Sequence, residues 1–161
     1  MNINPAYLDV GFRALADTLI HEIYHIMGFS PTLMEYYIDP YKDVLKLTDI
    51  ATFDSRGNIK GIKTEQVLYV ARKHFKCPYL RSVNFENEGG EGSAGAHWER
   101  SIMMNEMMTA SDIASPRISD ITLALMQDTG WYMTDFKYAE NFTFFKNIGC
   151  KLDLDIDLAD L

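Results

Sequence analysis

Two histidines and a glutamate form the pattern with the clearest chemical potential in this sequence. The stretch reads His21-Glu22-Ile23-Tyr24-His25. Residues four apart lie on one face of an α-helix, so His21 and His25 can direct ring nitrogens at one ion. Glu22 sits about 100° around the helix from His21, which is badly placed for a third ligand but suits a base acting on a water that a metal activates. The spacing alone leaves a metal site and a polar helix face as equal alternatives.

An amphipathic helix is expected to carry this pattern. From about residue 9 to residue 28, apolar side chains recur at steps of three and four along one stripe. The two histidines lie off the stripe, which directs them toward a cleft and away from the deepest core. Gly28 is expected to bend the chain and end the helix. The stripe consists of Phe12, Leu15, Leu19, Ile23 and Ile26.

A catalytic zinc usually takes three protein ligands and one water, so the pair needs a third partner. Where H-E-x-x-H is extended by x-x-G-x-x-H, the third histidine falls at position 31, and this chain has Pro31 there. His74 has basic neighbours that disfavour a bound cation, so we interpret it as a structural or surface residue. His97 follows a Gly-rich stretch whose small residues suit a crowded site, and it is the better candidate. A carboxylate from Asp39 or Asp43 is the remaining alternative.

Length and composition indicate one globular domain. The 161 residues, 47% of them hydrophobic and 24% charged, are enough for a real core. The net charge of -8 argues against a nucleic-acid partner, which would need a basic patch. The sequence has no apolar run near the ~20 residues of a membrane span and no visible signal peptide. Because only about twenty residues precede the histidine pattern, we expect Met1 to be internal to a longer natural protein.

Local signals predict further elements. Residues 54–57 read as the turn of a small hairpin. Thr64 is expected to begin a helix that ends before position 77. A second helix is expected over roughly 120–128. Residues 152–158 alternate apolar and acidic side chains, which predicts either an edge strand or a disordered acidic end.

Two cysteines and one sequon bear on the compartment. The pair Cys77 and Cys150 is compatible with one disulfide or with two free thiols, and the count alone favours free, buried thiols. Asn141 begins an N-x-T glycosylation triplet, which also arises often by chance. The four methionines of residues 103–108 are expected to be adaptable core filler.

Taken together, these residues resemble the leishmanolysin family of zinc metalloendopeptidases, within the metzincin group. That family has H-E-x-x-H-x-x-G-F-S with a long insertion before its third histidine, and residues 21–30 read the same way. The resemblance runs over nearly the whole chain, to about residue 152. It rests further on residues 71–78, the Gly-rich run 89–95, and residues 95–99, 105–110, 123–125, 128–132 and 147–150.

The resemblance implies a complete set of zinc ligands. His97 becomes the third ligand beside His21 and His25, holding one Zn²⁺ per chain. Met108 becomes the methionine of the Met-turn, the tight turn that runs beneath the metal in metzincins, with Met107 as its nearest rival.

The resemblance also implies a disulfide. Cys77 and Cys150 match positions that pair in the family, which reverses the preference for free thiols and indicates an oxidising compartment. The sequon at Asn141 becomes plausible in that setting. We therefore expect a longer natural form to be extracellular or at the cell surface, with membrane association only through that form.

The implied fold is α+β and mostly helical: a metzincin-like catalytic core fragment that lacks the N-terminal sheet of the family. Residues 1–152 form the core, and residues 153–161 form an acidic C-terminal tail. Within the core, the active-site helix covers about 9–28, a long insertion covers 31–96, and residues 97–110 carry the third ligand and the Met-turn.

The expected function is zinc-dependent hydrolysis of peptide bonds in proteins or peptides through a metal-activated water. Metzincin substrates lie along the sheet that is missing, so two alternatives stay open. One is a catalytically inactive zinc-binding fragment that acts as a cell-surface adhesion or interaction module. The other is a fragment that does not fold alone, because the apolar stripe of its first helix would be partly uncovered. The sequence predicts neither substrate preference nor oligomeric state.

Overall fold

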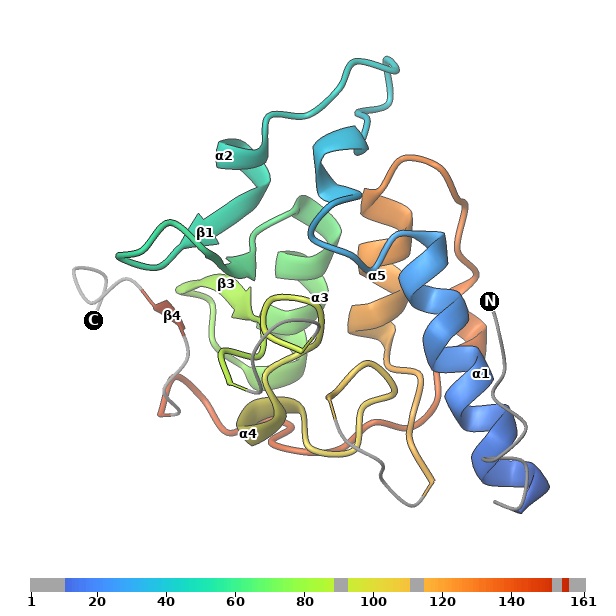
Figure 1. Cartoon of the computed structure of the whole chain (residues 1–161). Helices are drawn as coiled ribbons and strands as arrows, with labels where there is room; N and C mark the ends of the chain where they lie inside the picture. The colour runs from blue at the N-terminus through green and yellow to red at the C-terminus, as the bar shows by residue number, and fades with distance from the viewer. Residues whose placement is uncertain (1–10, 89–92, 111–114, 152–154, 157–161) are drawn as a thin grey trace.

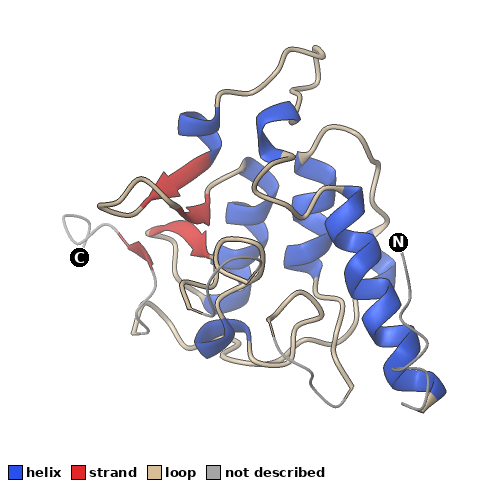
Figure 2. Cartoon of the chain, in the orientation of Figure 1, coloured by secondary structure: helices blue, strands red, loops and turns tan. Residues whose placement is uncertain are grey.

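The computed structural model describes residues 11–88, 93–110, 115–151 and 155–156. A central helix, α3 (Glu65–Phe75), packs against strand β3 (Leu80–Asn84) and against helix α5 (Asp120–Asp128). In Figure 1 the strands lie to one side of α3 and α5 to the other, with the long helix α1 (Phe12–Met27) at the far edge from the strands. The chain is thus α+β with helices predominating, as predicted (Figure 2). Short helical turns complete it: η2 (Met34–Tyr36), α2 (Leu47–Ile50), α4 (Arg100–Met103) and η3 (Phe136–Tyr138).

The sheet is small and antiparallel, with the order β1-β2-β3-β4. Strands β1 (Ala51–Phe53) and β2 (Ile59–Ile62) form the predicted hairpin. The Asp54 carboxylate closes its turn by accepting hydrogen bonds from the backbone N–H groups of Arg56 and Asn58. A side chain that mimics a backbone turn is the reason aspartate favours this position.

The tail contributes an edge strand, one of its two predicted alternatives. Strand β4 (Asp155–Ile156) pairs antiparallel with β3, with Ile156 opposite Leu80. Residues 152–154 and 157–161 of the tail lie outside the described residues.

The two core helices begin close to the predicted residues. Helix α5 follows Ser119, whose hydroxyl accepts a hydrogen bond from Thr122 N–H. Helix α3 follows Thr64, but that side chain makes no capping hydrogen bond. The Asp128 carboxylate, at the end of α5, instead accepts from Val67 N–H at 2.9 Å. The last residue of one helix therefore caps the first turn of the other, which fixes their mutual packing.

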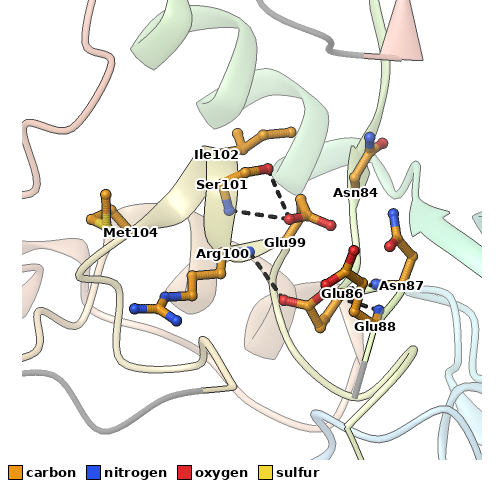
Figure 3. Close-up of a pocket in the computed structure, with 9 residues that line it drawn as sticks. All are labelled: Asn84, Glu86, Asn87, Glu88, Glu99, Arg100, Ser101, Ile102 and Met104. Atoms are coloured by element: carbon orange, nitrogen blue, oxygen red, sulfur yellow. Dashed lines mark hydrogen bonds between the residues drawn. The ribbon is translucent and has the colours of Figure 1, made fainter. Parts of the chain in front are cut away.

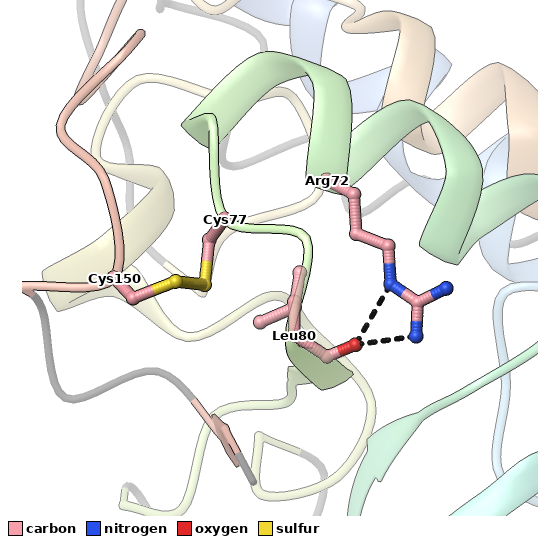
Figure 4. Close-up of a disulfide and its surroundings, with 4 residues drawn as sticks. All are labelled: Arg72, Cys77, Leu80 and Cys150. Carbon is pink, nitrogen blue, oxygen red and sulfur yellow. Dashed lines mark hydrogen bonds between the residues drawn. A yellow bond between two sulfur atoms is a disulfide. The ribbon is translucent and has the colours of Figure 1, made fainter. Parts of the chain in front are cut away.

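A disulfide joins the end of α3 to the C-terminal segment. Cys77 and Cys150 are bonded, so the preference for free thiols that the cysteine count gave was wrong and the expected pairing is present. Close by, the Arg72 guanidinium donates two hydrogen bonds to the Leu80 carbonyl, at 3.0 and 2.8 Å (Figure 4). These contacts hold the turn between α3 and β3.

Helix α1 differs from the prediction in the face that it turns to the core. The predicted stripe was expected to face the core, with partial uncovering as one alternative; no residue of α1 is fully buried and three members of the stripe are exposed, in agreement with that alternative. A neighbouring row of the helix makes the contacts, because the rest of the described chain lies against that side only. The exposed members are Phe12 (87%), Ile26 (63%) and Ile23 (45%), and the contacting row is Ile20, Tyr24 and Met27. Among the described helices, none is both long enough and apolar enough to cross a membrane.

Candidate metal centre

The end of α1 sets the direction of the chain after the second histidine. The helix ends at Met27, and Gly28 follows with φ of 146°. An L-side chain rarely adopts this conformation, and a Cβ here would lie 3.0 Å from Thr129 Cγ2. The turn places Phe29 in the core, where its side chain is fully buried.

An aromatic cluster brings the third histidine to α1. The ring of Phe29 packs edge-on against Trp98, with centroids 4.9 Å apart. The ring of Phe85 stacks on Trp98, with centroids 5.2 Å apart. Because Trp98 directly follows His97, burial of these three rings carries His97 to the C-terminal end of α1.

The backbone around His97 is fixed on both sides. The carbonyl of His97 accepts from Glu86 N–H, and the carbonyl of Glu86 accepts from Gly95 N–H, both at 2.8 Å. On the other side, Trp98 N–H donates to the Met108 carbonyl at 2.8 Å. The segment is irregular, and its position comes from contacts with residues far away in sequence.

The three candidate ligands converge. The Nε2 atoms of His21 and His25 lie 3.0 Å apart, and those atoms lie 3.1 and 3.2 Å, respectively, from Nε2 of His97. In the part of the chain that the structure describes, these histidines form the one cluster of His, Cys, Asp or Glu side chains suited to a metal ion. Three nitrogens bound tetrahedrally to one zinc at 2.0–2.1 Å would be about 3.3 Å apart, close to the observed spacing.

Each ring is held by a backbone carbonyl at its other nitrogen. Nδ1 of His21 contacts the Met107 carbonyl at 2.7 Å, Nδ1 of His25 the Phe29 carbonyl at 2.7 Å, and Nδ1 of His97 the Ser93 carbonyl at 3.0 Å. A carbonyl only accepts, so each Nδ1 carries the hydrogen and each Nε2 of the neutral ring carries a lone pair. Three converging lone pairs repel one another unless a cation lies between them. The donor set therefore fits a metal ion.

The protonation of His97 agrees with this geometry. Burial lowers the pKa of His97, the hydrogen bond to Ser93 opposes that shift, and the neighbouring His25 and His21 lower the pKa further. A neutral imidazole is the form that binds a metal. The negative charge of Glu22 opposes this lowering of the His97 pKa, and the Glu22 side chain is exposed.

The residues considered as alternatives lie elsewhere. His74 is buried in the last turn of α3, where its Nε2 donates to the Phe144 carbonyl at 2.8 Å. The Asp39 carboxylate closes a local loop by accepting from Tyr41 N–H and Asp43 N–H. Neither of these aspartates belongs to the converging cluster.

The methionines and the sequon are placed as follows. Met108 is fully buried and Met107 nearly so, and it is the backbone carbonyl of Met107 that contacts His21. Asn141 is exposed at the surface.

A pocket of about 520 Å³ adjoins the segment after His97, but it is not the histidine site (Figure 3). Glutamates dominate its polar wall, and the backbone N–H of Arg100 contacts Glu86 there. None of the three histidines lines it. Its lining residues are Asn84, Glu86, Asn87, Glu88, Glu99, Arg100, Ser101, Ile102 and Met104.

Sequence reasoning missed the groups that orient the rings. The carbonyls of Ser93, Phe29 and Met107 have no signature in a sequence, because every residue has a carbonyl. Glu106 was also missed, although a carboxylate inside an otherwise apolar Met-rich stretch is a visible signal, and the structure buries it completely.

Comparisons with known proteins identify the family of the chain. The sequence profile of the leishmanolysin peptidase family matches residues 1–155. The chain is similar to a leishmanolysin-like peptidase of Drosophila melanogaster (32% identity over 86% of this chain and 25% of the relative). It is also similar to a leishmanolysin-like peptidase of Caenorhabditis briggsae (31% identity over 93% of this chain and 28% of the relative). Leishmanolysin of Leishmania donovani is 30% identical over 93% of this chain and 24% of the relative. The chain spans about a quarter of the length of these relatives. With a family match over almost all of its residues, the chain belongs to the leishmanolysin family of metallopeptidases.

Proposed function

We propose that this chain is the zinc-binding catalytic core of an endopeptidase that hydrolyses peptide bonds in proteins. The observation that carries the proposal is the convergence of three Nε2 atoms that lie 3.0–3.2 Å from one another, each on a ring whose Nδ1 donates to a carbonyl. A site with three nitrogen donors favours zinc over calcium or magnesium, because these two ions prefer oxygen ligands. His21, His25 and His97 are the proposed ligands.

Each proposed residue has a chemical task. A zinc ion held by these three histidines would supply polarisation of a peptide carbonyl and activation of water at neutral pH. Glu22 accepts the proton of the attacking water and passes it to the leaving amine. Its exposure and its place on α1 directly after His21 support this role. The three carbonyls that hold the Nδ1 atoms keep the rings in the tautomer that ligation needs.

Met108 is proposed as the Met-turn methionine of a metzincin-like site. Its complete burial and the hydrogen bond from Trp98 N–H to its carbonyl support this assignment over Met107. We also propose the division into a core of residues 1–152, with the insertion 31–96 between the second and third ligands, and a tail of residues 153–161.

The disulfide supports an extracellular or cell-surface location for the natural protein, because such bonds persist in oxidising compartments. Glycosylation of Asn141 is compatible with its exposure.

A second candidate is a metal-binding chain without peptidase activity that serves as an interaction module. Exposure of Phe12, Ile23 and Ile26 on α1 favours it, because apolar side chains on one helix face suit a contact with another surface.

Cleavage of an unfolded protein distinguishes the two candidates. The chain, loaded with one equivalent of Zn²⁺, is expected to cleave casein, to lose this activity with a chelator and to regain it with zinc. Glu22→Gln is expected to retain zinc and to lower kcat by roughly 10²- to 10⁴-fold. Glu35→Gln, which removes another exposed carboxylate, serves as the matched control and should keep the parental rate. Stoichiometric zinc without any cleavage would favour the interaction module.

A further inference from the structure

A completely buried carboxyl group lies next to the segment that holds His21 of the candidate metal centre. The Glu106 side chain is completely buried, and both of its oxygens accept hydrogen bonds. Oε1 accepts from the backbone N–H and the hydroxyl of Ser119, at 3.1 and 2.8 Å, and from the hydroxyl of Thr122, at 2.5 Å. Oε2 accepts from Met108 N–H at 2.5 Å. Four donors therefore satisfy the hydrogen-bonding capacity of this buried carboxyl group.

The direction of every one of these hydrogen bonds is fixed. The hydroxyl of Thr122 already accepts from Trp98 Nε1–H at 2.8 Å, so its own hydrogen points to Glu106. The hydroxyl of Ser119 already accepts from Thr122 N–H, so its hydrogen also points to Glu106. Two backbone N–H groups supply the rest. The site thus offers donors only, which is the arrangement that a carboxylate requires and that an amide cannot match.

This network reaches two of the three ligands through their immediate neighbours. Met107, whose carbonyl orients His21, lies between Glu106 and the Met108 N–H that Glu106 holds. Trp98, which follows His97, is tied to the same carboxylate through Thr122. The two segments are also joined directly, since Trp98 N–H donates to the Met108 carbonyl. Helix α5, which carries Thr122, is the rigid element on which all of this is anchored.

We propose that Glu106 is the positioning residue of the metal centre: its carboxylate locks the Met107 carbonyl behind His21 and the Trp98 segment behind His97, and so sets the geometry of the nitrogens. Glu106 touches neither the metal nor the substrate. The inference rests on the proposed metal-binding function. It adds that the affinity of the site depends on a buried carboxyl group that is not itself a ligand.

The test measures metal binding apart from activity. In Glu106→Gln, the NH₂ group of the amide must take the place of one carboxylate oxygen and face its donors. Facing the single Met108 N–H is less unfavourable than facing the three donors from Ser119 and Thr122, so we expect the hydrogen bond from Met108 N–H to be lost. We expect the zinc dissociation constant of the 161-residue chain to rise about 10- to 100-fold, as when other outer partners of metal ligands are removed. Co²⁺ in place of zinc should show a changed visible ligand-field spectrum.

Asp128→Asn is the control for loss of a hydrogen-bonded carboxylate on the same helix-bearing core, although Asp128 is half-buried where Glu106 is completely buried. Asp128 also lies on a core helix and also accepts from a backbone N–H, but it caps α3 and contacts no part of the histidine site. Both variants should lower the melting temperature. Only Glu106→Gln should change the zinc affinity and the Co²⁺ spectrum.

Thr122 provides a test that leaves Glu106 in place. Thr122→Val removes the hydroxyl that joins Trp98 to the carboxylate at nearly constant volume, and it should weaken zinc binding in the same direction. Thr122→Ser keeps the hydroxyl and should restore parental affinity. These two variants decide the question if Glu106→Gln does not fold.

Three results would overturn the inference. One is parental zinc affinity and an unchanged Co²⁺ spectrum in folded Glu106→Gln, or in Thr122→Val where the former does not fold. Another is an equal loss of affinity in Asp128→Asn. The third is a parent chain that binds no metal at all, which removes the proposed function as well and is thereby distinguished from the first two.

Discussion

The chain buries two histidines to nearly the same extent but in different surroundings. His97 is 8% exposed and His74 is 6% exposed, and burial is the largest cause of a lowered pKa in both. His74 donates from Nε2 to the Phe144 carbonyl and stacks on the ring of Phe142, 4.9 Å away. His97 donates from Nδ1, and its Nε2 faces the Nε2 atoms of two other histidines.

The difference shows what separates a ligand from a structural histidine. Burial and a carbonyl partner are common to both regions, so neither indicates a metal. The distinguishing property is which nitrogen the carbonyl holds and what the other one faces. A carbonyl at Nδ1 of His97 directs Nε2 into a cluster, whereas a carbonyl at Nε2 of His74 fastens that ring to the C-terminal segment.

The largest effect is expected from exchanging the two histidines for alanine in turn. His97→Ala removes one of three ligands and should lower zinc affinity by more than about 100-fold, since changes to outer partners alone cost 10- to 100-fold. His74→Ala should keep parental zinc affinity and lower the free energy of unfolding by about 2–4 kcal/mol, through a cavity beside Phe142. Zinc titration and urea unfolding of both variants give the comparison. An equal loss of zinc affinity in the two variants would contradict the distinction between a ligand and a structural histidine.

The disulfide belongs to the region of His74, and its removal should affect stability there and not the metal. It closes a separation of 73 residues, for which the chain-entropy relation predicts about 4 kcal/mol of stabilisation. The double replacement of Cys77 and Cys150 by alanine should therefore lower the free energy of unfolding by an amount of that order. Zinc affinity, measured well below the melting temperature, should stay parental. A loss of zinc binding in the folded variant would show that the two regions are coupled.

Gly28 tests the backbone of the metal region. Gly28→Ala meets an unfavourable φ of 146° and a 3.0 Å contact with Thr129 Cγ2. We expect a loss of about 1–2 kcal/mol in unfolding free energy. Because the residue lies between His25 and the Phe29 carbonyl that holds it, zinc binding should weaken as well. Gly57→Ala is the control, since it has a positive φ of 85° but no neighbour near its Cβ, and it should affect stability alone. Similar zinc affinities in the two variants would contradict this.

The two regions also differ in how much the sequence could predict. Outside the metal region, local signals predicted the start of α3 at Thr64 and the hairpin turn at residues 54–57, but the cysteine count alone did not predict the disulfide. In the metal region, the His21–His25 spacing predicted two ligands that do lie together, because helix geometry relates neighbours in sequence. The position of His97, 72 residues beyond His25, depends on burial of Phe29 against Trp98, which no local pattern encodes.

The orientation of α1 was mispredicted for a related reason. Periodicity identifies an apolar stripe on a helix but does not say whether the rest of the chain covers it. The contacting row of Ile20, Tyr24 and Met27 is shorter than the stripe and lies beside the histidines, so the cluster and the row are anchored together.

The smallest effect is a pH dependence of stability that comes from His74. Burial lowers the pKa of His74 below the 6.5 of the unfolded chain; the Phe144 hydrogen bond and Asp120 oppose this shift, and Lys146 adds to it. Below about pH 6.5 the unfolded state binds a proton that the folded state resists, so stability falls as the pH falls. In chelator-treated protein, His74→Phe should unfold with a flatter dependence between pH 7 and pH 5 than the parent, because the remaining histidines are common to both. Identical slopes would mean that His74 titrates alike in the folded and unfolded states, which would contradict the lowered pKa that burial gives it.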